Sequence, residues 1–444
     1  MVIRQAHSEG TMSVTTTNFA ANMKIVYGTI QDQVSTQPAF MNLLGDGSKF
    51  GKPINNLSSK GYVFEARLRP NFYMGFRPES ATAGVGASGN QGLANATVYL
   101  KYGYVPEVIT GQADVLSRGD AKAFMQSKAL ELKYSIKDFV SHCNVVAVGA
   151  EPGGQLAQVA AAPAASSTVF YADNAGYLPG ALYLRIGMPV DSNAVGGGAL
   201  TVSSEVITAI NYATRAVTKT TTTATWTSGE AITLGGEAAL TSGTFPYTME
   251  GLNSIVLDSG ALQGLNPATS GQESWKAFVW DAAGDSLSSD KIHALRQFIK
   301  NRCGLNPDLF VFPSAQIAQM VKFATQNYRF ETSTGKPVGK KALDLGYDVF
   351  EYAGLSIVED KDCRPDRIFC GVTETMKKFE AMPLQLLSND AGEWTRVIAT
   401  TGLVDAVAGL LGTYLNIGTL TRSAWGVIKG LDADDIWYSN AATI

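Results

Sequence analysis

The stretch "YVPEVITGQADVLSRGDAKAF", residues 104–124, passes from one hydrophobic pattern to another. Its first residues end a segment in which apolar and polar side chains alternate, as they do in a β-strand. After Ser117 or Asp120, either of which can cap a helix, apolar residues recur about every 3.6 positions until Gly149. The pattern predicts a strand that leads into a helix ~45 Å long. The apolar stripe of this helix consists of Ala121, Met125, Ala129, Leu132, Ile136, Phe139, Cys143 and Val146.

Two β-type segments precede this helix and flank a glycine-rich stretch. They are "GYVFEARLRPNFYMGF", residues 61–76, and "ATVYLKYGYVPEVITGQADV", residues 96–115. Together they predict a hairpin whose arms, each about twenty residues long, reach on the order of 60 Å. An isolated two-stranded ribbon is marginally stable in water, so we expect the hairpin to rest on another chain.

The outer end of the predicted hairpin carries "NFYMGFRP", a dense group of large side chains. Few residues of the same domain can cover them there, which favours a protein interface. The alternative is that they pack along their own hairpin as cross-strand pairs. The candidate interface residues are Phe72, Tyr73, Met74, Phe76 and Arg77.

Gly84, Gly86 and Gly89 have the G-x-G-x-x-G spacing of a dinucleotide-binding loop. That loop requires a buried strand before the glycines and a helix after them. Here a turn-like run, residues 78–80, precedes them and a β-type segment follows. A hairpin tip is therefore the favoured interpretation, and a nucleotide-binding enzyme is the weaker alternative.

Composition limits the function classes. The chain has 444 residues, 45% of them hydrophobic, which suits two or three folded domains. Its formal charge is −4, with no basic tract, so a sequence-reading nucleic-acid binder is disfavoured, whereas weak non-specific contact stays open. We expect neither a signal peptide nor a membrane span.

The rest of the chain divides by composition. Residues 1–54 are polar with short apolar groups and predict an extended arm. Residues 151–262 are rich in Gly, Ala, Ser and Thr, with short β-type runs, and predict a small barrel or sandwich. From Ser288, which can cap a helix that Gly304 closes, the pattern turns to α/β.

Residues suited to catalysis or metal binding are few. His7, His142 and His293 have no partner at a recognisable motif spacing. We therefore expect no catalytic site, no cofactor and no metal. Glu359, Asp360, Asp362 and Asp366 in "VEDKDCRPDR" lack EF-hand spacing and predict a solvated turn. Cys143, Cys303, Cys363 and Cys370 predict buried free thiols of a reducing cytoplasm.

This order of segments resembles the major capsid proteins of tailed double-stranded DNA bacteriophages, which share the Hong Kong 97-like fold. Residues 104–124 resemble the junction between extended loop and spine helix of that family. "LFVFPSAQIAQMV", residues 309–321, resembles the strand-to-helix passage of its axial domain, and "YAGLSIVEDKDCRPDRIFCG", residues 352–371, resembles the strands that lead back to the peripheral domain.

The resemblance implies an α+β fold with an inserted all-β domain. The parts would be an N-terminal arm (1–54), an extended β-hairpin loop (55–114), a spine helix (115–150), the inserted β domain (151–262), the axial domain with return strands (263–400) and a C-terminal peripheral-domain segment (401–444).

The implied function is a non-enzymatic shell protein. Copies would form the pentamers and hexamers of an icosahedral shell around double-stranded DNA, which they contact weakly and without specificity. We expect a separate scaffolding protein and a portal as partners, a virion location, and assembly in the host cytoplasm. An encapsulin-like compartment shell is the alternative, although such shells are usually shorter and lack a large inserted β domain.

Overall fold

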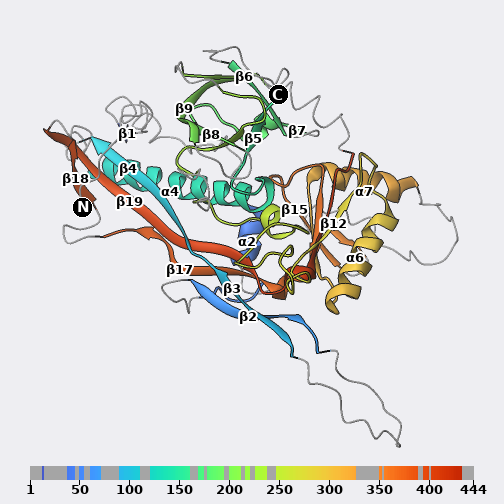
Figure 1. Cartoon of the computed structure of the whole chain (residues 1–444). Helices are drawn as coiled ribbons and strands as arrows, with labels where there is room; N and C mark the ends of the chain where they lie inside the picture. The colour runs from blue at the N-terminus through green and yellow to red at the C-terminus, as the bar shows by residue number, and fades with distance from the viewer. Residues whose placement is uncertain are drawn as a thin grey trace, which may run out of the picture.

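The computed structural model describes residues 13–14, 38–45, 50–54, 61–71, 90–110, 121–160, 169–174, 178–194, 200–211, 216–220, 226–237, 247–326, 350–352, 355–388, 394–399 and 402–432. Within these ranges the chain combines helices with four β-sheets (Figure 1). The mixed helix and sheet composition predicted from the sequence is thus confirmed.

The long helix α4 (Ala121–Asn144) lies along a five-stranded sheet (Figure 1). It ends in one π-helical turn, η1 (Val145–Gly149), so the predicted helix end is confirmed. Helix and sheet approach closely at Gly103, where a Cβ atom would lie 2.5 Å from the Phe139 ring. The sheet order is β1-β4-β19-β17, with β18 paired to β19. The strands are β1 (Ser13–Val14), β4 (Lys101–Thr110), β17 (Met376–Leu386), β18 (Trp394–Ala399) and β19 (Gly402–Thr419).

Strands β2 (Tyr62–Arg69) and β3 (Gly92–Val98) form a separate antiparallel ribbon. One face of the ribbon packs on Leu265 and Trp275 of the same chain through small side chains such as Ala96. The base of the predicted hairpin therefore finds its support within its own chain, because the loop that contains Trp275 reaches under it.

The prediction of a second hairpin arm about twenty residues long is wrong. The arm divides after Val98, and the chain continues as β4, which pairs with β19 rather than with β2. The main chain is held at the division, since Asn416 Nδ2 donates a 2.7 Å hydrogen bond to the carbonyl oxygen of Tyr99. The paired ribbon is thus about half as long as the alternating sequence suggests.

Consecutive strands between residues 157 and 234 form a closed barrel. Their order is β10-β9-β8-β11-β5-β6, and β6 pairs back to β10, while β7 adds to β6. Of the predicted alternatives, barrel or sandwich, the barrel is therefore the one that forms. The strands are β5 (Ala157–Val159), β6 (Val169–Asn174), β7 (Leu178–Pro179), β8 (Pro189–Asn193), β9 (Leu200–Asn211), β10 (Ala216–Lys219) and β11 (Ala231–Leu234), with a 3-10 turn η2 (Gly180–Tyr183).

A six-stranded sheet in the order β12-β20-β16-β13-β15-β14 carries helices α6 (Ser289–Cys303) and α7 (Ser314–Gln326) (Figure 1). The predicted caps of α6 are confirmed: the Ser288 side chain accepts from Lys291 N, and Gly304 is left-handed, with φ 76°. No helix in the described ranges is both long and apolar enough to cross a membrane. The strands are β12 (Phe278–Asp281), β13 (Leu309–Phe312), β14 (Phe350–Tyr352), β15 (Leu355–Glu359), β16 (Ile368–Gly371) and β20 (Trp425–Lys429), with 3-10 turns η3 (Thr373–Thr375) and η4 (Arg422–Ala424).

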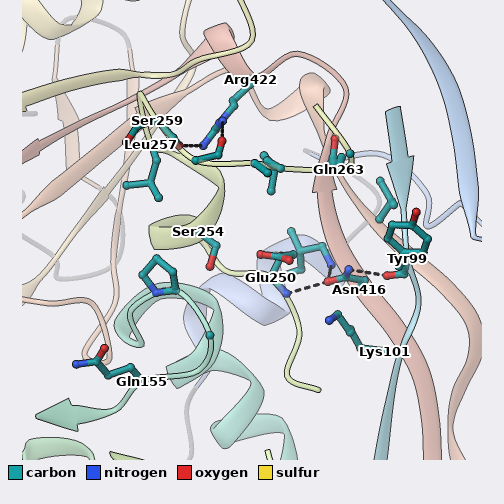
Figure 2. A pocket seen from close by; sticks show the side chains of 18 of the residues that line it. Tyr99, Lys101, Gln155, Glu250, Ser254, Leu257, Ser259, Gln263, Asn416 and Arg422 are labelled. Carbon is teal, nitrogen blue, oxygen red and sulfur yellow. Dashed lines mark hydrogen bonds between the residues drawn. The ribbon is translucent and has the colours of Figure 1, made fainter. Parts of the chain in front are cut away.

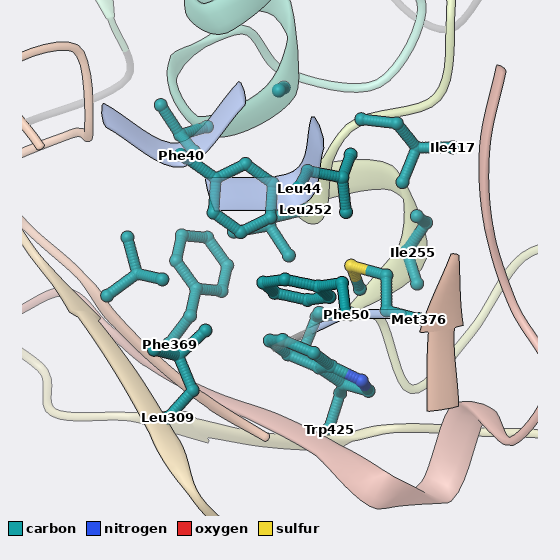
Figure 3. Close-up of a cluster of buried hydrophobic side chains, with 14 of the residues drawn as sticks. Phe40, Leu44, Phe50, Leu252, Ile255, Leu309, Phe369, Met376, Ile417 and Trp425 are labelled. Carbon is teal, nitrogen blue, oxygen red and sulfur yellow. The ribbon is translucent and has the colours of Figure 1, made fainter. Parts of the chain in front are cut away.

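The central core gathers residues from nearly the whole described chain (Figure 3). The short helices α2 (Ala39–Gly45) and α5 (Leu252–Ile255) meet there. Phe40 and Phe50 are completely buried and pack edge to face, 5.8 Å between ring centroids. Burial of one such ring stabilises the fold by about 2–3 kcal/mol. The end of the segment predicted as an extended arm thus belongs to the main core.

Candidate functional site

The predicted interface residues and the glycine motif both lie outside the described residues. Phe72, Tyr73, Met74, Phe76 and Arg77, like Gly84, Gly86 and Gly89, belong to the segment between Asn71 and Asn90. That segment joins β2 to β3, whose last paired residues are Arg69 and Gly92. The element that follows the glycines is a strand, not the helix that a dinucleotide-binding loop requires, so the flanks favour the hairpin interpretation.

The outer face of the ribbon, opposite Trp275, is open. Val63 on β2 is 48% exposed and Leu93 on β3 is 53% exposed. Leu93 pairs across the ribbon with Arg67, so apolar and charged groups alternate on this face. Val63 and Leu93 are therefore separate apolar side chains on a face that also carries charged groups.

A second exposed aromatic group lies on the five-stranded sheet. Tyr102 and Tyr104 are 58% and 48% exposed, and they share one face of β4 because they are two residues apart. Tyr414 of β19 pairs with Tyr102 in register, and the two ring centroids are 4.9 Å apart. Gly103 points the other way, toward α4. We call Tyr102, Tyr104 and Tyr414 the tyrosine face; it lies on the side of the sheet away from α4.

The sequence analysis missed this face. The signal was present as "KYGY", in which two tyrosines flank a glycine in a β-type segment. It was attributed to the hairpin, whereas β4 belongs to the larger sheet. Tyr414 joins the face only through the pairing of two strands about 310 positions apart, which a single sequence does not reveal.

A cavity of about 360 Å³ lies where the barrel meets the rest of the chain (Figure 2). Asn193 and Thr233 line it from the barrel, and Lys101 and Glu250 line it from the other side. The Asn416 side chain spans the wall, accepting a 2.9 Å hydrogen bond from Glu250 N while its own amide donates to Tyr99 O (Figure 2). Among the described residues that line the cavity there is neither histidine nor cysteine, so these residues form no histidine–nucleophile pair.

The charged side chains around the cavity interact with other groups of the protein. Burial raises the pKa of Glu250, although the Lys101 ammonium opposes the rise. Burial also lowers the pKa of Lys101, and it lowers that of Arg422 to about 10. The Arg422 guanidinium donates to four backbone oxygens, including Ile255 O at 2.9 Å, and therefore braces loops rather than presenting its charge to a ligand.

The acidic turn predicted to be solvated is buried at Asp360, Asp362 and Asp366, so the prediction is wrong for these three acids, whereas Glu359 at the end of β15 is exposed as predicted. Asp360, Asp362 and Asp366 are 0%, 6% and 4% exposed. Asp360 Oδ2 accepts from Phe40 N at 2.9 Å, and Asn144 Nδ2 donates to both Asp360 and Asp362. The turn therefore fastens α2 to the end of α4. Burial raises the pKa of Asp360, and no metal-binding group of acids, histidines or cysteines occurs among the described residues.

Arginines neutralise the second half of this turn. Arg367 binds Asp366 through two hydrogen bonds of 3.0 and 3.1 Å, and its Nη1 lies 2.9 Å from Glu151 Oε1. The same nitrogen donates to Asn253 Oδ1 at 2.7 Å. Burial alone would raise the pKa of Asp366, but Arg367 and Arg364 lower it below its usual value. Sequence analysis recognised the acids here but not the arginines as their partners.

Histidine and cysteine residues take structural positions. His142 Nε2 lies 2.6 Å from Glu237 Oε1 and so joins α4 to the turn after β11. Burial by itself would lower the pKa of His142, but the Glu237 charge and hydrogen bond raise it. Cys143, Cys363 and Cys370 are buried free thiols as predicted, and Cys303 is half-buried. Burial raises the pKa of Cys143 to about 12, which makes it a poor nucleophile.

Comparison with known proteins gives a result at the level of fold. No family model and no curated protein matches the sequence. A chain of the cyanophage A-1(L) capsid asymmetric unit matches with a TM-score of 0.53 and 10% sequence identity, covering 91% of this chain and 95% of that chain. This chain has the fold of a phage capsid protein. The fold expectation drawn from the resemblance is thereby confirmed at that level.

Two further solved structures match with lower TM-scores. A capsid chain of an empty GTA particle matches with a TM-score of 0.45 at 11% identity, covering 90% of this chain and 99% of that chain. The SrpI encapsulin of Synechococcus elongatus matches with a TM-score of 0.25 at 12% identity and covers only 35% of this chain and 54% of that chain.

Proposed function

We propose that this chain is a phage major capsid protein, a non-enzymatic subunit that assembles into the pentamers and hexamers of an icosahedral shell around double-stranded DNA. The observation that carries the proposal is the shared fold with a phage capsid chain over more than nine-tenths of both chains. In this assignment the architecture is Hong Kong 97-like, α4 is the spine helix, the six-stranded sheet is the axial domain, and the barrel is an inserted domain.

The open surfaces support assembly into a larger structure. The ribbon exposes Val63 and Leu93, and the tyrosine face exposes two aromatic rings on the opposite side of the sheet from α4. A monomeric protein has little use for two separate apolar surfaces of this kind. A shell subunit needs at least two, because each copy must contact several neighbours.

Electron microscopy of the purified full-length chain tests the proposal. We expect closed particles, or rings of five or six subunits, either alone or after a scaffolding protein is added. Particles from infected or expressing cells should contain double-stranded DNA in the phage setting, whereas a protein cargo would identify a compartment shell instead. A chain that stays monomeric with its own scaffolding protein present contradicts the proposal.

Within the shell, we place the β2–β3 loop against the tyrosine face of a neighbouring copy. Phe72, Tyr73, Met74, Phe76 and Arg77 supply the aromatic and cationic groups that tyrosine-rich surfaces bind well. Replacing residues 72–89 by Asn-Gly shortens the loop but keeps the β2–β3 pairing. A deletion from Gly61 to Asp114 is unsuitable, because it would also remove β4, which pairs with β19 across ten residue pairs.

We expect the loop-shortened chain to remain folded but to form no closed shells. Tyr102→Ser with Tyr104→Ser should weaken assembly in the same way, while Tyr247→Ser, an exposed tyrosine outside these surfaces, should leave it unchanged. Thermal unfolding controls for folding, and particle yield by sedimentation is the readout. Normal particle yield from the loop-shortened chain would refute this interface.

The remaining partners follow from the same assignment. We propose a separate scaffolding protein, a portal at one vertex, and weak non-specific contact with the packaged DNA, as befits a formal charge of −4. Assembly would take place in the host cytoplasm, and the mature location would be the virion. Efficient formation of uniform shells by this chain alone would argue against a separate scaffold.

A further inference from the structure

An exposed aromatic pair lies on the six-stranded sheet, away from the surfaces discussed above. Phe298 of α6 is 49% exposed and stacks on Phe278 of β12, with ring centroids 4.7 Å apart. Leu305, 42% exposed, follows the end of the same helix. The core-facing residues of α6 are Ile292, Leu295 and Ile299, so Phe298 lies on the flank of the helix nearest to β12.

Strand β12 forms the edge of its sheet. Among the described strands it pairs with β20 alone, so half of its backbone groups face away from the sheet. An uncovered sheet edge is a template for unwanted pairing, and folded proteins usually cover it. Helix α6 carries Ala294, a small side chain, one turn before Phe298. The Phe278–Phe298 pair and the open edge of β12 together form the candidate docking surface.

The described chain ends close to the start of α6. Asp432 N donates to Asp285 O at 3.1 Å, just before α6, and Asp432 O accepts from the α7 residue Gln316. Lys291, on the first turn of α6, binds Asp285 at 3.2 Å and so places a positive charge beside Asp432. The following sequence, residues 433–444, is "ADDIWYSNAATI" and lies outside the described residues.

We propose that residues 434–438 of this segment dock on this surface of their own chain, with Trp437 on the Phe278–Phe298 pair. The acids Asp434 and Asp435 would meet Lys291 and the N-terminal end of α6, where negative charge is favoured. Trp437 lies five residues beyond Asp432, a reach of about 16 Å when extended. Phe298 lies ten residues beyond Ser288, about 15 Å along the helix.

The direction of the segment also suits the edge of the sheet. Strand β12 runs toward the Asp281 end, where β20 ends and Asp432 follows, and α6 then runs back toward Phe278, since Arg302 donates to Ala277 O. A segment that leaves Asp432 along α6 is therefore antiparallel to β12. It can pair with the open edge and cover it, which would keep the free subunit from edge-to-edge association.

Cysteine crosslinking in the full-length chain tests the docking. In a Cys303→Ser background, Ala294→Cys and Asp435→Cys lie at matching distances of about 9–10 Å, the first from Ser288 along α6 and the second from Asp432 along the extended segment. We expect mild oxidation to form a disulfide within one chain, seen as loss of free thiols without a dimer band. Adding Phe298→Ser should slow the reaction about tenfold, whereas Ile186→Ser, an exposed residue of the barrel, should not.

A second measurement needs no engineered cysteine. Amide hydrogen exchange at residues 278–281 should be slow in the full-length chain and several-fold faster with Trp437→Ala, while exchange in the barrel strand β9 stays the same. A dimer band in the crosslinking experiment, or equal exchange in both chains, would overturn docking within the chain. Shell formation is not a readout of either experiment, so failure here leaves the proposed function untouched.

Discussion

Two groups of buried charges hold different parts of this molecule together. In the barrel, Lys219 and Glu205 form an isolated ion pair, 3.0 Å apart, with side chains 1% and 0% exposed. The turn after β15 has a network of hydrogen bonds and ion pairs that reaches α2, α4 and α5 and involves Asp360, Asp362, Arg364, Asp366, Arg367, Glu151, Asn144 and Asn253. The barrel pair joins neighbouring strands, whereas the turn joins segments that are far apart in the chain.

The two groups of charges contribute differently to the stability of the fold and to the positions of the segments that they join. A lone buried ion pair gains little net stability over apolar residues of similar size, because desolvation offsets the attraction. Such a pair instead helps to fix which residues of the two strands lie opposite each other. Lys219 lies at the position where the register of the β9–β10 pairing shifts. A network in which each charge has several partners offsets desolvation better and fixes the positions of separate segments.

Breaking the network at Arg367 should have the largest effect. Arg367→Met removes the two hydrogen bonds to the buried Asp366 carboxylate and one of the two cations beside the partly exposed Glu151, so we expect a loss of about 3–5 kcal/mol in the free energy of unfolding. Urea unfolding measures it. Arg185→Met is the matched control: this arginine is exposed and donates only to nearby backbone oxygens, so its loss should be below about 1 kcal/mol. Equal losses in both variants would show that the network is unimportant.

Breaking the barrel pair should cost slightly less and should be reversible. Lys219→Met leaves Glu205 unpaired, with an expected loss of about 3 kcal/mol, and adding Glu205→Leu should restore most of it. The corresponding double variant Arg367→Met with Asp366→Leu should recover little, because the contacts of Arg367 with Glu151 and Asn253 stay lost and Arg364 also loses its contact with Asp366. Similar recovery in both double variants would remove the distinction between pair and network.

The contact of His142 with Glu237 joins α4 to the turn after the barrel strand β11. Its loss should have the smallest effect of the three on the free energy of unfolding. The folded pKa of His142 is raised, so its contribution is present below the usual histidine pKa and is lost as pH rises through the folded value. We expect His142→Gln to cost roughly 0.5–1 kcal/mol near pH 5.5 and almost nothing near pH 8.5. Glu237→Gln should remove the same pH dependence, and a larger cost at the higher pH would contradict the assignment.

Local signals in the sequence predicted most of the elements. The caps at Ser288 and Gly304, the helix that continues to Gly149 and the closely spaced strands of the barrel follow from short-range features of the sequence, and the structure confirms each. The errors involve partners that are distant in sequence. The charges after β15 were predicted to be solvated because Asn144 and Glu151, which bury them, lie more than 200 positions away.

The candidate surfaces show the same limit. Alternation identified residues 96–115 as extended, but only the pairing of β4 with β19 creates the tyrosine face. The aromatic loop residues Phe72 to Arg77 lie outside the described residues, so their role stays a prediction.

The capping of α2 has a consequence for the order in which the chain matures. Phe40 N is bound by Asp360, 320 positions later, and Asn144 holds Met41 N from a third segment. At a synthesis rate of about 5–20 residues per second, the start of the chain waits on the order of half a minute for this partner. Until then Phe40 and Phe50 lack the core that buries them. A newly made chain therefore passes through a period in which these aromatic side chains are not yet buried, and it completes its core only when nearly all of it has left the ribosome.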